Sequence, residues 1–350
     1  MPLETLDFEE PIAVLLREVE ALSVLPRTDA RDRELETLKR RIESVRGDLY
    51  RSLTPWQRVQ VARHPNRPGL EDVIERLFTN FVEIHGDRRF ADDHAIMTGF
   101  GDYKGQPVLV VGHIKGGDTK DKIFRNFGYA RPEGYRKALR AMRLAGKFSR
   151  PIIVFVDTPA AYPGIESEER GVAEAIAVNL REMMLLDTPI VVIVSGEGGS
   201  GGALGIAIGD TVLMQEFAIY SVIPPEGCAA ILWRDASKKI QAAEALKLTA
   251  PDLLKAGIID GIVPEPVGGA HTDPMGAARL IDAALERALA ELHALDATTR
   301  LDRRYEKFRG MGREGVDFVD EDAEGGKDAE GAKDAEVQKA DRLTDPVRSR

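Results

Sequence analysis

A run of ten residues, SGEGGSGGAL at positions 195–204, offers backbone amides and very few side chains. It follows the apolar run PIVVIVS and precedes several small residues, which predicts a turn from a buried strand into a helix. Free N–H groups at the start of a helix point outward, and the helix dipole adds to their field. Because glycine lets a ligand approach the backbone closely, Gly201 and Gly202 could hold a developing oxyanion there.

Other motifs share the same letters. Gly196–Gly201 matches the dinucleotide pattern G-x-G-x-x-G, but a new strand is expected at Thr211, which leaves no room for a full crossover helix. Gly198–Gly202 matches the hydrolase pattern G-x-S-x-G, with Ser200 as nucleophile and a histidine such as His271 as base. A purely structural turn is a further interpretation. The loop by itself leaves the amide site, the hydrolase and the structural turn open.

Two further turns rich in glycine and proline precede expected helices, DTPAAYPG at 157–164 and PPEGCAAILW at 224–233. They add Gly164, Glu226 and Gly227 to the candidate binding residues. No convincing pair of nucleophile and base accompanies the three turns. Together they suggest a site built from backbone amides.

The turns must be positioned by strands and helices that alternate along residues 85–265. The β-rich runs are PVLVVGHIKG, PIIVFVDTP, PIVVIVSGE and TVLMQEFAIYSVI, with helical patterns between them. This order predicts an α/β protein with parallel strands and crossover helices. The units that begin at Pro151 and Pro189 resemble each other and are about 40 residues apart, the length of one supersecondary unit. Their turns would share the sheet edge at which α/β proteins bind ligands.

The two ends of the chain differ from this middle part. Residues 1–75 predict a helical arm, in which Ile12, Leu15 and Val19 lie on one helical face, and a further helix is expected at 71–81. The domain that carries the turns is expected at 76–300. Residues 301–350 include the low-complexity run DEDAEGGKDAEGAKDAEVQKADR, which predicts a disordered charged tail.

Composition excludes several classes of protein. The chain has 350 residues, of which 43% are hydrophobic and 30% charged, enough for a sizeable core. Its single cysteine, Cys228, rules out an internal disulfide and a zinc ribbon. The net charge of −10 argues against a general nucleic-acid binder. No apolar run approaches the roughly 20 residues of a membrane span, and no secretory signal is evident, so we expect a cytoplasmic protein without a membrane partner.

Six motifs in unbroken order, over about residues 35–300, resemble the alpha subunits of bacterial acetyl-CoA carboxylase carboxyltransferase. They are HGDRRFADDHAI, KGGDTKDKIFRNFG, PEGYRKALRAM, DTPAAYPGIESEERG, GEGGSGGALGIAIGD and YSVIPPEGCAAILW. The resemblance implies a crotonase-like (ClpP/crotonase) fold, a spiral of stacked ββα units. It also implies transfer of a carboxyl group from carboxybiotin on a carrier protein to acetyl-CoA, which gives malonyl-CoA in the first committed step of fatty-acid synthesis.

The resemblance also implies partners and cofactors. A beta subunit with a zinc ribbon would complete a cytoplasmic complex of two alpha and two beta subunits, so this chain would be active only with that subunit. Biotin would arrive on the biotin carboxyl carrier protein, and ATP would be used only by a separate biotin carboxylase. No metal is expected in this chain, and no phosphate-binding G-x-x-x-x-G-K-[ST] motif occurs in it. A serine hydrolase that uses Ser200 and a non-catalytic crotonase-like scaffold are the alternatives.

The family's oxyanion hole on the biotin side maps onto Gly201 and Gly202. Removal of one N–H by Gly202→Pro is therefore expected to lower turnover by about 10²–10³ without unfolding the chain. The substrate-binding candidates are Gly198, Gly199, Ser200, Gly164, Glu226, Gly227, Lys115, Lys120, Lys122 and Arg125. The basic members could attract the CoA phosphates, or they could belong to a solvated charged loop. Four residues depart from the common family pattern: Gly117, Ala160, Glu166 and Pro224.

The motif HGDRRFADDHA at 85–95 also has the residue types of a metal site. Acidic turn residues that cap backbone N–H groups are the commoner explanation, and we assign no metal to it. Cys228 is expected to be buried in the packing rather than reactive.

Overall fold

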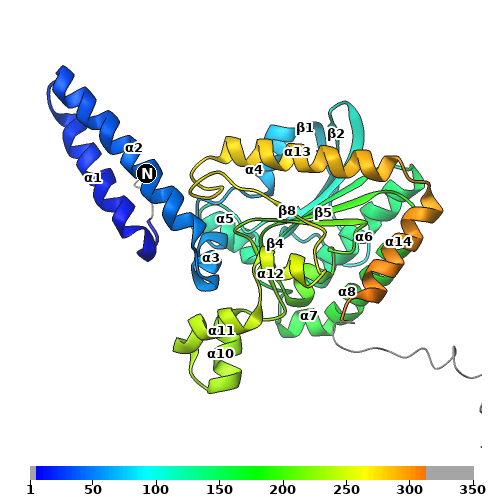
Figure 1. Cartoon of the computed structure of the whole chain (residues 1–350). Coiled ribbons are helices and arrows are strands. Elements are labelled where there is room, and N and C mark those ends of the chain that lie inside the picture. The colour runs from blue at the N-terminus through cyan, green and yellow to red at the C-terminus, as the bar shows by residue number, and fades with distance from the viewer. Residues whose placement is uncertain (1–4, 313–350) are drawn as a thin grey trace, which may run out of the picture. The chain divides into compact units, whose positions relative to one another are not determined.

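Two strands with continuous apolar sequences, β4 (Ile152–Thr158) and β5 (Ile190–Gly199), lie at the centre of the fold (Figure 1). They pair in parallel, with Ile152 opposite Ile190 and Val156 opposite Val194. Both faces of these strands are buried, as continuous apolar runs indicate. The computed structural model of the chain describes residues 5–312.

Within residues 5–312, eight strands form one mixed sheet in the order β1-β2-β3-β4-β5-β6-β8, and β7 pairs with the end of β5. The other strands are β1 (Phe78–Glu83), β2 (Ile96–Tyr103), β3 (Gln106–His113), β6 (Thr211–Gln215), β7 (Ile219–Ser221) and β8 (Gly261–Val263). The pairs β1–β2 and β2–β3 are antiparallel and the rest are parallel. The predicted α/β class is confirmed, and the antiparallel start of the sheet is an addition that the sequence did not predict.

Helices cover both faces of the sheet (Figure 1). On one face, α6 (Pro132–Lys147) and α8 (Val172–Leu185) pack against side chains such as Val154 and Val192. On the other face, α4 (Leu70–Leu77) and α13 (Pro274–His293) pack against Ile153, Phe155 and their neighbours. The remaining helices are α1 (Glu10–Val24), α2 (Asp29–Arg51), α3 (Pro55–Ala62), α5 (Thr119–Phe124), α7 (Ile165–Glu169), α9 (Ser200–Leu204), α10 (Pro225–Trp233), α11 (Lys239–Leu246), α12 (Ala250–Lys255) and α14 (Ala297–Gly310). None of the helices that the structure describes is both long and apolar enough to cross a bilayer.

The N-terminal helices follow the sequence prediction except at their end. Helices α1 and α2 pack on each other through Ile12, Leu15 and Ile42, and Val19 of the predicted apolar face packs against this cluster. The helix expected at 71–81 is wrong in its second half, because α4 ends at Leu77 and β1 begins at Phe78. The run FTNFVE pairs with β2, and its aromatic and β-branched residues suit a strand better than a helix.

The boundary expected at residue 300 is also wrong. Helix α14 continues to Gly310, and the guanidinium of Arg304 within it is fully buried. It donates two hydrogen bonds of 2.8 Å to the carboxylate of Asp210, and others to the carbonyls of Met183, Leu186 and Thr188. Charged residues can therefore be part of an ordered helix here because they are paired. The rest of the predicted tail, from residue 313, lies outside the described residues.

Candidate functional site

The three turns predicted from the sequence meet at one edge of the sheet. Thr158 at the end of β4 lies opposite Gly198, and Gly198 lies opposite Tyr220 of β7, which leads into α10. Parallel strands bring their carboxyl ends to a common edge, so this meeting follows from the topology. The predicted common edge is confirmed.

Helix α9 begins directly after β5, so its first amides lie at this edge. Gly202 is buried there, and its carbonyl accepts a hydrogen bond of 3.2 Å from the hydroxyl of Tyr135 on α6. A Cβ atom at Gly202 would overlap the backbone of Ala160 and Ala161. The expectation that Gly202→Pro leaves the fold intact is therefore wrong, because a side chain at this position displaces the loop that follows β4.

Gly201 lies in a different environment from its neighbour. The nearest atom to a Cβ at Gly201 would be Cδ1 of Ile176, at 3.6 Å, which is an ordinary van der Waals contact. Glycine within a helix costs roughly 0.5–1 kcal/mol relative to alanine. Packing against residues 5–312 thus gives no reason for glycine at position 201.

Three of the other four candidate glycines have contacts that require a small residue, and the fourth, Gly227, has a tighter contact than usual. A Cβ at Gly199 would overlap the carbonyl of Pro159, and one at Gly198 would meet the ring of Tyr220. At Gly164 it would overlap the ring of Tyr162, and at Gly227 it would lie 3.2 Å from Ile223. These glycines therefore serve packing, whatever further role they have. A hollow of about 20 Å³ beside the turn is lined by residues that include Arg63, Glu197, Gly198, Gly199 and Pro224.

Glu197 is the charged centre of this edge. Its buried carboxylate accepts hydrogen bonds from Nε of Arg63 at 2.6 Å and from Nζ of Lys115 at 2.7 Å. Burial alone would raise the pKa of Glu197, but the charges of Lys115 and Arg63 outweigh it and hold the pKa below its usual value. The carboxylate beside the glycine turn is thus ionised and paired with two cations.

The same two cations extend to the other turns. Lys115 contacts Oδ1 of Asp157, at the end of β4, at 2.6 Å. Arg63, directly after α3, donates to Oε1 of Glu226 in the first turn of α10 at 2.7 Å. We call the five residues Asp157, Lys115, Glu197, Arg63 and Glu226 the Glu197 network. It joins all three turns through alternating charges.

Sequence reasoning found only part of this network. It singled out Lys115 and Glu226 but not Arg63 or Asp157, and it treated Glu197 only as a variable position in a glycine motif. A signal was present, since Asp157 and Glu197 are acidic residues at the ends of two buried strands. Arg63 is far away in the sequence, and no local pattern identifies it.

The four basic candidates, Lys115, Lys120, Lys122 and Arg125, do not form one cluster in the structure. Lys115 belongs to the Glu197 network, and Arg125 binds Glu71 at 2.7 Å and Asp121 at 3.2 Å. Lys120 on α5 is exposed and Lys122 is half-buried, and neither forms an ion pair with any described residue. Only these two lysines retain an unpaired charge for a ligand.

A cavity of about 260 Å³ adjoins the Glu197 network. It is lined by the segment 62–72, the segment 113–117, Lys122 and Asp157. His113, at the end of β3, is 1% exposed, and the backbone of Gly202 lies beside its buried ring. Burial, with a smaller contribution from the charge of Lys115, lowers the pKa of His113 to about 3, so the ring is neutral at pH 7.

Ser200 has no base. It lies at the turn into α9 with φ of 52°, and its hydroxyl forms no hydrogen bond with a histidine in the described part of the chain. His271, the candidate base, stacks on His64 with ring centroids 3.9 Å apart. Burial lowers the pKa of His271 to about 3. The geometry therefore does not assemble the nucleophile and base of a hydrolase.

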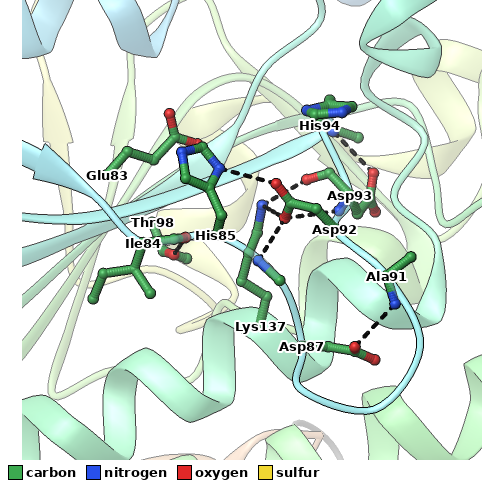
Figure 2. Close-up of polar contacts among 12 residues, drawn as sticks. Glu83, Ile84, His85, Asp87, Ala91, Asp92, Asp93, His94, Thr98 and Lys137 are labelled. Carbon is green, nitrogen blue, oxygen red and sulfur yellow. Dashed lines mark hydrogen bonds and ion pairs between the residues drawn. The ribbon is translucent and has the colours of Figure 1, made fainter.

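The acidic motif at 85–95 uses its carboxylates to bind the backbone and a buried lysine, as Figure 2 shows. Oδ1 of Asp87 accepts from the N–H of Phe90 at 2.8 Å, and Oδ1 of Asp92 accepts from the N–H of Gly86 at 2.9 Å. Lys137 donates to the same Asp92 oxygen at 2.6 Å. These contacts support the capping role that the sequence favoured. Across residues 5–312, no group of three or more His, Cys, Asp or Glu is placed to hold a metal ion.

Cys228 is buried in a small cluster with Ala229 and Ala242, so the prediction of a packing role is confirmed.

Comparison with known sequences identifies the family. A family model described as acetyl co-enzyme A carboxylase carboxyltransferase-like matches residues 5–312. The acetyl-coenzyme A carboxylase carboxyl transferase subunit alpha of Geobacter metallireducens is 54% identical over 309 residues, which cover 88% of this chain and 97% of that protein. The subunit of the same name from Oceanobacillus iheyensis is 52% identical over 88% of this chain and 98% of its own length.

Solved structures share the fold at lower identity. Transcarboxylase 12S is 20% identical with a TM-score of 0.52, over 64% of this chain and 42% of that one. The beta subunit of geranyl-CoA carboxylase from P. aeruginosa is 17% identical with a TM-score of 0.51, over 69% and 46% of the two chains. A Pseudomonas malonate decarboxylase hetero-tetramer in complex with coenzyme A is 16% identical with a TM-score of 0.52, over 73% and 92%. The chain spans less than half the length of the first two structures.

These likenesses concern the fold, and they confirm the crotonase-like class that the resemblance implied. The family match covers all described residues, and the relatives align over nearly their whole length. The two relatives named above are both called subunit alpha. The chain therefore belongs to the acetyl co-enzyme A carboxylase carboxyltransferase-like family.

Proposed function

We propose that this chain, together with a beta subunit, transfers a carboxyl group from carboxybiotin on a separate carrier protein to acetyl-CoA, which gives malonyl-CoA. Family membership makes the chain part of a carboxyltransferase, and the names of its relatives supply acetyl-CoA carboxylase and the term subunit. The proposal includes a zinc-ribbon beta subunit in a complex of two alpha and two beta chains, a separate biotin carboxylase that uses ATP, a cytoplasmic location, and the first committed step of fatty-acid synthesis.

The observation that carries the proposal is the environment of Gly201. Among the residues that the structure describes, a side chain there would meet only Ile176, at ordinary contact distance, yet the residue is glycine at a helix start. A ligand that approaches the amide closely would supply the missing reason for glycine. Such an amide is suited to hold an oxygen on which negative charge develops.

The charges around the turn support the same chemistry. An unpaired carboxylate beside the amides would repel a developing anion. Arg63 and Lys115 bind Glu197 and reduce the repulsion between its carboxylate and a developing anion, although the same two cations also bind Glu226 and Asp157.

The turn offers backbone N–H groups, which suit the oxygen of a biotin ureido group. A hydrolase substrate would instead need a nucleophilic side chain with a base beside it. When bound, carboxybiotin supplies the carboxyl group that is transferred. The chain's own contribution would be the N–H groups of Gly201 and Gly202, held in place by Tyr135 through the carbonyl of Gly202. No pair of nucleophile and base flanks the turn among the described residues, which agrees with a role in binding and orientation.

Reverse transfer tests the proposal. The chain would be mixed with a zinc-ribbon beta subunit, malonyl-CoA and free biocytin, and acetyl-CoA release would be followed. Each chain alone is the control. We expect release only from the mixture. No release from two folded chains that are shown to associate would overturn the proposal.

A fluorophosphonate probe separates this function from the hydrolase alternative. The transferase proposal expects no labelling of Ser200 in the active mixture, because the serine has no base. Labelling that is lost in Ser200→Ala would instead support a hydrolase.

A further inference from the structure

Asn179 on α8 is a fully buried polar side chain in an apolar part of the core. Val172, Ala175 and Met183 of the same helix belong to the core cluster that packs on the sheet. Asparagine favours a helix interior less than alanine or leucine does, and its buried amide costs free energy unless it is hydrogen-bonded. Neither helix propensity nor burial therefore explains an asparagine at this position.

The side-chain amide of Asn179 joins two backbone carbonyls from different helices. Its Nδ2 donates to the carbonyl of Tyr135 on α6 at 3.0 Å and to the carbonyl of Gly205 at 2.9 Å. Gly205 lies directly after α9. Because both partners are acceptors, they fix the orientation of the amide group. Two N–H groups on one short side chain are needed here, which gives a reason for asparagine.

Gly205 connects Asn179 to the amide of Gly202. The N–H of Gly205 donates to the carbonyl of Gly201 at 3.0 Å. That carbonyl and the N–H of Gly202 belong to one planar peptide unit and point in opposite directions. The position of Gly205 therefore fixes the direction of the Gly202 N–H. The hydrogen bond to the carbonyl also polarises the peptide unit, which makes its N–H a stronger donor.

Helix α9 depends on such contacts because it has only five residues. Helices shorter than about 12 residues are marginal by themselves, and Gly199 provides no side-chain cap for this one. The ring of Tyr135 packs so closely on Gly205 that a Cβ atom there would lie 2.6 Å from it. The hydroxyl of the same tyrosine donates to the carbonyl of Gly202. Asn179 and Tyr135 thus hold α9 at two points.

We infer that Asn179 is a positioning residue for the proposed transfer, because it fixes Gly205 and thereby the direction of the Gly202 N–H toward a developing oxyanion. The inference rests on the proposed function and adds a residue outside the three turns. It predicts a loss of turnover rather than of substrate binding, because the amide acts on charge that develops in the transition state.

Reverse transfer by the full-length chain and a zinc-ribbon beta subunit tests the inference through Asn179→Leu. Leucine has a similar shape but no N–H to donate. We expect kcat to fall by about tenfold to a hundredfold, while KM for biocytin and for malonyl-CoA changes by less than about twofold. Asn179→Ser keeps one donor on a smaller side chain, and it should also lower kcat should the leucine variant fail to fold.

Thr188→Val is the matched control. Thr188 is also buried, and its Oγ1 donates to the carbonyl of Arg150 at 2.8 Å, before the start of β5 and not at the turn. This variant should lose stability in urea denaturation but keep kcat within about twofold. An equal fall of kcat in both variants, or an unchanged kcat in folded Asn179→Leu, would overturn the inference.

Hydrogen exchange separates the inference from the proposed function, because it needs neither substrate nor beta subunit. Mass spectrometry follows the backbone amides of residues 200–206 in the full-length chain. Asn179→Leu should raise their exchange rates by about tenfold or more, whereas Thr188→Val should leave them unchanged. Unchanged rates in Asn179→Leu would show that Asn179 does not hold α9, which overturns the inference. An inactive wild-type mixture would instead overturn the proposed function.

Discussion

Arg304 and Asp210 form a second buried group of ions, which we call the Arg304 anchor. It differs from the Glu197 network in how its hydrogen bonds are satisfied. All five N–H groups of the Arg304 guanidinium have acceptors, two on Asp210 and three on backbone carbonyls. Glu197 instead lies between two cations that each have another carboxylate. It lines the small hollow beside the turn, and its partners Arg63 and Lys115 line the larger cavity.

The difference separates stability from function. A fully satisfied guanidinium leaves nothing for a ligand, so the Arg304 anchor serves to hold α14 on the sheet. The Glu197 network joins three turns at the edge where the strands end, and it sets the charge beside the glycine amides. Similar residue types thus have different roles. Every donor of Arg304 is already bonded within the chain, whereas the Glu197 network lies at the sheet edge beside the glycine amides.

The largest effect on stability is expected from removal of the Arg304 guanidinium. Arg304→Met would leave the buried carboxylate of Asp210 without its cation, with the N–H of Ile190 as its remaining donor, and should lower the free energy of unfolding by about 3–5 kcal/mol. Urea denaturation measures this loss, and the exposed neighbour Arg303→Met is the control. A loss below about 1 kcal/mol, the range of surface ion pairs, would contradict the anchor.

Glu197→Gln should act on turnover more than on stability. Arg63 keeps Glu226 and Lys115 keeps Asp157, so no cation is stranded. The turn nevertheless loses a charge-assisted contact, and kcat/KM for reverse transfer should fall by about tenfold to a hundredfold. Glu182 on α8 also binds two arginines, Arg143 and Arg181, and Glu182→Gln is the matched control. Equal losses in both variants would remove the distinction between the two roles.

Stability should depend on pH through His113, the neutral group beside the network. Its pKa of about 3 lies below the ordinary value of 6.5, so the unfolded chain takes up a proton first. The contribution to stability is full above about pH 6.5 and decreases as pH falls toward the folded pKa, by about 2 kcal/mol at pH 5. Urea denaturation at pH 7.5 and 5.0 should show a smaller pH effect in His113→Gln. The same pH effect in both proteins would refute this assignment.

Adjacent glycines sharpen the comparison within the turn itself. Gly201→Ala should raise the free energy of unfolding by about 0.5–1 kcal/mol, because alanine favours the helix. Turnover should fall by about tenfold, since the methyl group obstructs the approach to the amide.

Gly202→Ala is the counterpart, because its Cβ would overlap the backbone of Ala161. This variant should lose stability. Opposite signs of the stability change at 201 and 202 are the expected result. Normal turnover of Gly201→Ala would remove its amide from the mechanism.

The smallest effect is expected at Ser200. Its hydroxyl has no histidine partner, so Ser200→Ala should change kcat/KM by less than about twofold. A loss of a hundredfold or more would bring back the hydrolase interpretation.

Much of the fold could be predicted because it depends on local patterns. The apolar runs of β4 and β5 indicated buried strands, and the spacing of Ile12, Leu15 and Val19 indicated a helix with one apolar face. Errors arose where tertiary contacts overrode the pattern. Phe78 begins a strand because it pairs with Tyr103 of the neighbouring strand β2. Residues 301–310 are helical with Arg304 buried, because Asp210 and three carbonyls satisfy its charge.

The sequence by itself determined the strand–turn–helix units, the glycine turns and the family, since each depends on residues close together in the chain. Only the tertiary structure decided which charges meet. Glu197 pairs with Arg63 across 134 positions. It also decided which glycine of the pair 201–202 is required by packing, because that depends on the backbone of Ala160 and Ala161. Local sequence patterns determine which strands and helices have buried faces. Contacts between residues distant in the sequence depend on how the strand–turn–helix units pack against one another.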